Sequence, residues 1–275
     1  MTKRRILKII LRKLILLFLL FNVLVAVHAY RFTHFTTEKV KKFKHFDSLP
    51  LGQELKIFFT GVPVQRPVDT LFLDRKYEHI RIKSNKTIDC WLMRTARHRG
   101  TVILFHGHDS SKSALLKNAA EFTEMGYNTM LVDFMGCGGS EGNQTTIGYK
   151  EAEEVKSSFD YLQGQGERNI ILYGCSMGAT SILKAMHDYP INPKAIIIEC
   201  PFGTLYKTVC SRFHNQGLPS FPLAGMLTFW GGIENGFWAF SYKPVEYAKS
   251  VKCPALLMYG AVSYTHLTLP TNREV

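Results

Sequence analysis

Apolar strand-like runs alternate with helical segments from about residue 70 onward, and this alternation limits the fold more than any other feature of the chain. The run "TVILF" at 101–105 is continuously apolar, as a strand buried on both faces requires. Strands that alternate with helices predict an α/β fold, with a mostly parallel sheet flanked by helices. An antiparallel strand pair is predicted at its start, at 77–83 and 87–95. Further strands are predicted at 101–105, 127–134, 169–174, 195–200 and 254–260, and helices at 112–125, 147–163 and 177–188.

A serine lies at one of the predicted strand-to-helix junctions. The sequence Gly174-Cys175-Ser176-Met177-Gly178 fits the pattern G-x-S-x-G, directly after the strand at 169–174 and directly before the helix at 177–188. The pattern alone is weak evidence and could be a chance turn, but this placement is what a nucleophile elbow needs. The two glycines leave room for the backbones to cross closely. Ser176 is therefore predicted to be a nucleophile.

The loop after the strand 101–105 is the second candidate element of a site. Acyl transfer through a tetrahedral intermediate needs two N–H donors that hold the oxyanion. One donor is expected from the backbone of Met177, and the other from the loop His106-Gly107-His108, where Gly107 allows the backbone to approach. Two histidines without a third ligand make a poor metal site, so neither a metal nor a cofactor is predicted.

These motifs resemble the α/β-hydrolase superfamily, in particular its esterase, monoacylglycerol-lipase and serine-aminopeptidase-like branch, over roughly residues 70–260. The resemblance implies that Ser176 is the nucleophile, that the backbones of His108 and Met177 form the oxyanion hole, and that Gly107, Gly174 and Gly178 support them. Met135 stands where the family usually has an arginine. The segments that carry the resemblance are "LFHGH", "LVDFMGCGGSEG", "GCSMGA" and "PALLMYG".

The acid and the base of a serine triad are not found where the family places them. The family order is serine, acid, histidine, and no aspartate follows Asp188. Glu199, at the end of the strand 195–200, is a weak candidate for the acid, because some relatives use this position. The acid and base are instead expected after Ala261. The remaining later candidates are Glu234, Glu246, Glu274, His187, His214 and His266.

The last fourteen residues, 262–275, read "VSYTHLTLPTNREV" and resemble the in-frame translation of a sequencing-library adapter. They are expected to be a non-native tail, so His266 is not taken as the base. The natural protein is expected to continue past Ala261 with the acid loop, a helix, a strand and the histidine loop. The 275-residue chain is therefore expected to be truncated and inactive.

Two further segments divide the chain. Residues 201–245 hold ten aromatic residues and interrupt the strand–helix rhythm, so they are expected to be an inserted cap, either with a small core of its own or lining an apolar substrate pocket. Residues 1–30 contain the apolar run Leu14–Val27, in which only Asn22 is polar. They are read as a membrane anchor or a signal peptide, followed by a juxtamembrane stalk at 31–69 and the hydrolase domain at 70–261.

The charge of the chain belongs to this N-terminal region. Residues 1–45 carry eleven lysines and arginines against one acid, which accounts for +10 of the net charge of +12. The rest is nearly neutral, so no nucleic-acid partner is predicted. A single-pass anchor with an extracytoplasmic domain is favoured, and a secreted or periplasmic protein after signal cleavage is the alternative.

Together these features predict a membrane-anchored serine hydrolase acting on a carboxylic ester with an apolar group, or an amide, through an acyl-enzyme on Ser176. The substrate is expected to be a small or lipid-like molecule. The alternatives are a serine peptidase or thioesterase of the same fold, and a non-catalytic binding or scaffold protein built on it.

Overall fold

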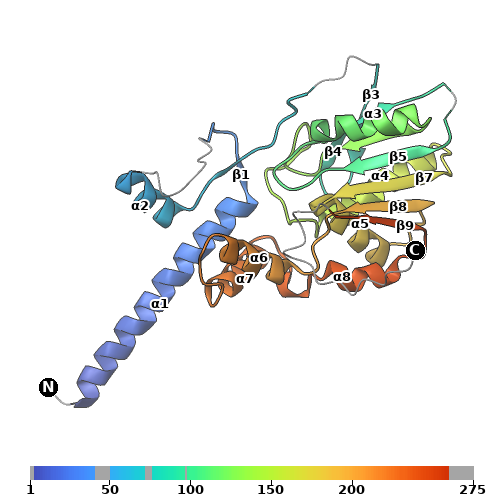
Figure 1. The fold of residues 1–275 in the computed structure, drawn as a ribbon. Helices are drawn as coiled ribbons and strands as arrows, with labels where there is room; N and C mark the ends of the chain where they lie inside the picture. The colour runs from blue at the N-terminus through green and yellow to red at the C-terminus, as the bar shows by residue number, and fades with distance from the viewer. Residues whose placement is uncertain (1–2, 41–49, 72–75, 97, 260–275) are drawn as a thin grey trace.

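The computed structural model describes residues 3–40, 50–71, 76–96 and 98–259 (Figure 1). Its centre is a seven-stranded sheet in the order β3-β4-β6-β5-β7-β8-β9. The pairs β3–β4 and β4–β6 are antiparallel, and every other neighbouring pair is parallel. The predicted α/β sheet and its opening antiparallel pair are thus confirmed. The strands are β3 (Glu78–Lys83), β4 (Thr87–Met93), β5 (Thr101–Phe105), β6 (Asn128–Val132), β7 (Ile170–Cys175), β8 (Ala195–Glu199) and β9 (Ala255–Met258).

Helices cover both faces of the sheet. One face packs Trp91, Leu104 and Tyr173 against α3 (Leu116–Glu124). The other face packs against α4 (Glu151–Gly164) and α5 (Met177–Asp188), which bury Val155 and Ile182 in the main core. All side chains of β5 and β6 are buried, as the continuous apolar runs predict.

Two helices begin elsewhere than the apolar spacing predicts. The helix expected at 112–125 opens with a 3-10 turn, η2 (Lys112–Leu115), before α3. The helix expected from residue 147 starts at Glu151, because Ile147 and Gly148 have φ angles of 57° and 99°, which no α-helix accommodates.

The segment 201–245 forms a helical layer above the carboxyl ends of the strands. It contains α6 (Leu205–Asn215), α7 (Leu223–Glu234) and the 3-10 turn η3 (Ala239–Ser241). Leu205, Ala239 and Tyr242 form a small core beneath it. We call residues 201–245 the cap. The chain then passes through α8 (Pro244–Tyr247) and η4 (Ala248–Ser250) into β9.

The N-terminal region is one long helix followed by a short one. The helix α1 (Lys3–Thr33) projects from the body, with α2 (Leu51–Thr60) on one side and α6 and α7 on the other (Figure 1). Among the described residues α1 alone is long and apolar enough to cross a membrane, a test that a signal sequence also passes. The short strands β1 (Phe35–Thr36) and β2 (Val64–Gln65) then pair with each other in parallel, and the Phe35 N–H donates to the carbonyl of Asn143 in the body at 2.6 Å.

Candidate active site

Ser176 occupies the turn between β7 and α5. Its backbone has φ 50° and ψ −106°, a conformation that a residue with a side chain rarely adopts. Two hydrogen bonds hold the turn: the Ser176 N–H donates to the carbonyl of Glu199 at 2.8 Å, and the Thr180 N–H donates to the carbonyl of Ser176 at 3.1 Å. Such local strain costs of order 1–3 kcal/mol and is found at functional sites.

The two glycines of the motif are required by close backbone contacts. A Cβ atom at Gly174 would lie 2.6 Å from the backbone N of Ala179, and one at Gly178 would lie 2.3 Å from the carbonyl O of Phe105. Both distances are shorter than any van der Waals contact. The first turn of α5 therefore crosses β5 and β7 at a separation that only glycine allows.

The loop after β5 lies against the serine. A Cβ atom at Gly107 would lie 3.6 Å from Ser176 Cβ, so the peptide beside Gly107 is next to the nucleophile position. Met177 is the first residue of α5, where backbone N–H groups have no partner within the helix. The structure thus brings together Ser176, Met177 and the His106–His108 loop.

His106 is held as a structural residue below this loop. It is fully buried, its Nδ1 donates to the carbonyl of Gly107 at 2.7 Å, and its Nε2 accepts from the Phe134 N–H at 3.1 Å. Both ring nitrogens are used, and burial lowers the pKa of the imidazole. His106 therefore fixes the shape of the loop and is not a candidate base.

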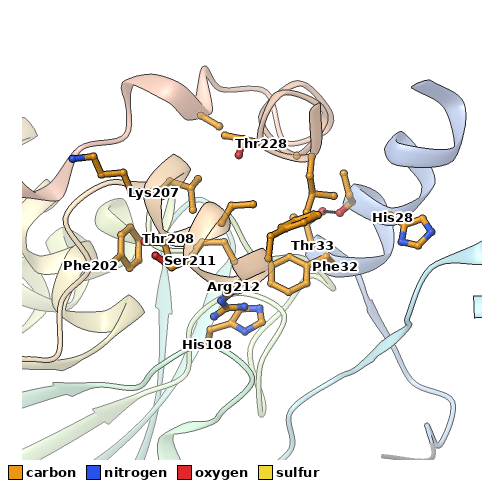
Figure 2. Close-up of a pocket in the computed structure, with 18 of the residues that line it drawn as sticks. His28, Phe32, Thr33, His108, Phe202, Lys207, Thr208, Ser211, Arg212 and Thr228 are labelled. Carbon is orange, nitrogen blue, oxygen red and sulfur yellow. Dashed lines mark hydrogen bonds between the residues drawn. The ribbon is translucent and has the colours of Figure 1, made fainter. Parts of the chain in front are cut away.

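The His108 side chain faces the cap rather than the sheet. Its ring stacks on Phe32 of α1 with centroids 5.1 Å apart, and Arg212 of α6 lies beside it (Figure 2). Burial first, and the Arg212 charge second, lower the pKa of His108 to about 4, so the ring is neutral at pH 7. Its buried Nε2 has no hydrogen-bond partner in the part of the chain that the structure describes.

Ser176 is among the lining residues of a cavity of about 1260 Å³. Figure 2 shows part of the lining of this cavity, including His108 and Arg212. Its walls come from α1, α2, α6 and α7, and its floor from the loops that carry His108, Ser176 and Cys200. Most of the lining is apolar, and its charged members are the cations Lys207 and Arg212; no carboxylate lines it within the described residues. The side chains Phe202, Phe213, Leu227 and Phe237 supply much of the cap's share.

The Glu199 carboxylate is bonded to a phenol, and not to any imidazole that the structure describes. It accepts a hydrogen bond from the phenol of Tyr173, whose oxygen in turn accepts from Asn118 at 3.1 Å. Tyr173 belongs to the sheet face that α3 covers. Burial, and next the hydrogen bond to Glu199, raise the pKa of the Tyr173 phenol. This pairing accounts for an acidic residue at the strand end.

The Ser176 hydroxyl has no imidazole as a hydrogen-bond partner within residues 98–259. His187 pairs with Asp188 at 2.7 Å, and His214 lies on the exposed side of α6. His266 and the residues after Ala261, where the acid and base are predicted, lie outside the described residues.

A largely buried ion cluster holds the loop that follows β6. The sequence pattern gave no sign of this cluster. Lys112 has no exposed side-chain surface, and its ammonium donates to Asp69 at 2.6 Å, to Asp89 at 2.8 Å and to Asp133. The three carboxylates lie close enough together to resemble a metal site, but the ammonium already supplies the positive charge among them. Its partners lie far apart in the sequence, so only the fold reveals the cluster.

The cluster fixes the loop that follows β6. The other carboxylate oxygen of Asp133 accepts from the Lys112 N–H at 2.7 Å, and the Ser140 hydroxyl donates to the carbonyl of Asp133 at 2.7 Å. Met135 is buried in this loop, with its N–H donating to Glu154 at 3.0 Å. The methionine is thus accommodated in the core without an arginine's charge.

Comparisons with known proteins agree with this geometry. The model of the serine aminopeptidase (S33) family matches residues 96–225, which include β5, β6, β7, β8 and the start of the cap. An uncharacterized Bacillus subtilis protein, YqkD, is 26% identical over 164 residues, which are 58% of this chain and 54% of that protein. The chain therefore spans about half the length of this curated relative.

Solved structures share the fold. The Pyrococcus furiosus esterase Pf2001 superposes with a TM-score of 0.54 and 23% identity, over 70% of this chain and 75% of the esterase. The Penicillium α/β hydrolase GrgF superposes with a TM-score of 0.50 and 16% identity, over 66% of this chain and 79% of its own. With its sheet order, its serine turn and these superpositions, the chain has the α/β-hydrolase fold, and its residues 96–225 are similar to the serine aminopeptidase (S33) family.

Proposed function

We propose that this protein is a serine hydrolase that cleaves a carboxylic ester through an acyl-enzyme on Ser176. The observation that carries the proposal is the strained turn of Ser176, with φ 50° between β7 and α5, at the floor of a large apolar cavity. A serine that only packed or capped a helix would not need this conformation, since residues with side chains avoid it.

The reaction follows from the groups around the serine. The Ser176 Oγ attacks the ester carbonyl, and the oxyanion accepts hydrogen bonds from the backbone N–H groups of Met177 and His108. The serine proton passes to a base and then to the departing alkoxide, which leaves as the alcohol. Water attacks the acyl-enzyme in the second half, which releases the carboxylic acid and restores the serine.

The base and its acid remain predictions placed after Ala261. Residues 98–259 bring neither to the Ser176 hydroxyl, and a triad without its base retains only the part of catalysis that comes from binding and the oxyanion hole. A chain that lacks both groups would therefore turn over slowly. Activity measurements should use the protein expressed from its natural gene, read past the codon for Ala261.

The cavity favours esters over free amino-terminal peptides. The family model that matches the chain is that of a serine aminopeptidase, which makes amide hydrolysis the second candidate. An aminopeptidase substrate carries an ammonium group, which a carboxylate would recognise. The described lining offers Lys207 and Arg212 instead, and these cations would repel it. An apolar acyl or alkyl ester fits both the charge and the lining.

The test is covalent labelling of Ser176. A fluorophosphonate probe should label the wild-type protein and not the Ser176→Ala variant, and labelling should be lost when a short p-nitrophenyl ester competes. Hydrolysis of that ester should be at least about a thousandfold faster in the wild type, since the nucleophile and its base act as a unit. Equal labelling of both proteins would overturn the assignment, and faster hydrolysis of an aminoacyl p-nitroanilide would favour the peptidase.

A further inference from the structure

The second half of α1 is a wall of the catalytic cavity. Phe21, Leu24, His28 and Phe32 line the same cavity as Ser176, spaced so that they share one side of the helix. His28 also bonds the carbonyl of Phe58 in α2 at 2.7 Å, and Phe32 stacks on His108. The helix that the sequence presents as an anchor is therefore part of the site.

Specific contacts hold α1 in this place. Val25 and Ala29 are buried, with 7% and 2% of their surface exposed. Asn22 is the one polar residue in the apolar run 14–27, and its side-chain oxygen accepts from Trp230 Nε1 of α7 at 3.3 Å. Cleavage after Ala29 would remove these residues and open the cavity on one side. These contacts favour a retained helix over a signal peptide.

The first half of α1 is too short to cross a bilayer alone. Residues 3–20 span about 27 Å at a rise of about 1.5 Å per residue, and this half carries the basic residues up to Lys13. A hydrocarbon core about 30 Å thick needs about 20 residues, and counting these from Lys13 reaches Phe32. If α1 spans the bilayer, the part of α1 that lines the cavity therefore lies within the hydrocarbon core.

The surface around the second half of α1, the half that packs on the cap, is apolar, as a surface within the hydrocarbon core must be. Phe58 and Phe59 of α2 have 55% and 62% of their surface exposed, and Phe221 and Trp238 of the cap have 84% and 53%. These segments lie on either side of α1 (Figure 1). Exposed aromatic and aliphatic groups around an apolar helix are typical of a surface that enters a membrane.

We infer that α1 is a retained wall of the cavity, and that the substrate is a long-chain ester of the membrane that reaches Ser176 from the bilayer along this helix. The inference rests on the proposed function of Ser176. The acyl chain would lie against Leu24 and Phe21, and the carbonyl would lie at the level of Phe32, beside His108 and Ser176.

The test compares two Leu→Trp variants one helical turn apart. Leu24 lines the cavity, whereas Leu20 is 60% exposed on the free half of α1. We expect L24W to lower the ratio of labelling rates between a hexadecyl and an ethyl fluorophosphonate by at least about tenfold, because each methylene group displaced from an apolar site costs about fourfold. L20W should change this ratio by less than about twofold.

Labelling by the ethyl probe reports that the variants are folded. If neither probe labels the wild-type protein, the result contradicts the assignment of Ser176 as the nucleophile and does not test α1 as the cavity wall. The wall is then tested by binding of a fluorescent long-chain ester to Ser176→Ala protein in lipid nanodiscs, which needs no turnover. L24W should weaken this binding by the same factor in that background.

Three results would overturn the inference. One is an unchanged chain-length ratio in L24W with intact ethyl labelling. Another is equal binding of the long-chain ester to both Leu→Trp variants. The last is an intact mass of the protein from its native membrane showing that the mature chain begins after Ala29, since the wall would then be absent.

Discussion

At the scale of single residues, the site depends on groups whose chemistry is set by burial. His108 is neutral because the cavity floor excludes water and Arg212 lies beside it. The folded protein binds fewer protons at this site than the unfolded chain does. His108 therefore contributes a loss of stability as the pH falls from 6.5 toward 4, and no pH dependence above that window.

Removing the Arg212 charge should raise the pKa of His108. In Arg212→Gln we expect a value above 4 but still below 6.5, because burial is the larger cause and remains. The measurement is an NMR titration of the His108 ring protons. Lys207→Gln removes another cation of the cavity lining, which lies away from the His108 ring (Figure 2), so it should leave the pKa of His108 unchanged. An unchanged pKa in Arg212→Gln would show that the guanidinium is not beside the ring.

At the scale of elements, the crossing of α5 over β5 and β7 is what presents the serine. Close backbone contacts allow only glycine at Gly174 and Gly178. Because the crossing requires these glycines, the position of the motif between a strand and a helix was predictable from the sequence. Strand β7 and helix α5 lie where the apolar pattern predicts them. The start of α4 was not predictable, because the positive φ angles of Ile147 and Gly148 depend on the fold around them.

Adding one methyl group at this crossing should destabilise the protein. Gly178→Ala places a Cβ 2.3 Å from the carbonyl O of Phe105, and we expect a loss of about 1–3 kcal/mol in the free energy of unfolding, together with loss of Ser176 labelling. The measurement is urea denaturation at neutral pH.

Gly164→Ala serves as the matched control. It adds the same methyl group in α4, where no atom lies within 4 Å, and should leave stability the same or raise it by up to about 1 kcal/mol. Equal unfolding midpoints for the two variants would contradict the close crossing.

At the scale of the whole molecule, a buried charge cluster and a docked helix join parts that the sequence keeps apart. The Lys112 cluster links Asp69, β4 and the end of β6. The docking of α1 could not be predicted, because residues 14–27 are apolar on every side and the pattern does not show which side meets the cap. Asn22 was the one irregularity, and its partner Trp230 lies 208 residues away.

Breaking the charge cluster should be costly. Lys112→Met leaves the buried carboxylates of Asp89 and Asp133, and the partly exposed one of Asp69, without their cation, and we expect a loss of about 3–5 kcal/mol at pH 7. Part of this loss should be regained as the pH falls, because protonation removes the repulsion between the carboxylates. Urea denaturation between pH 5 and pH 8 measures both effects.

The exposed Lys117→Met, on α3, is the control and should change stability by less than about 0.5 kcal/mol. A Lys112→Met protein as stable as this control would show that the carboxylates do not depend on the ammonium.

The docked half of α1 also has a consequence for how this protein can drift during evolution. A helix that meets only lipid tolerates almost any exchange among leucine, isoleucine, valine and phenylalanine. Leu17, with 65% of its surface exposed, has that freedom, whereas Leu24 faces the cavity and Ala29 is buried. If α1 is the retained cavity wall proposed above, substitutions at these inner positions would change which acyl chains fit, and substrate preference could shift through the helix while the serine loop stayed the same.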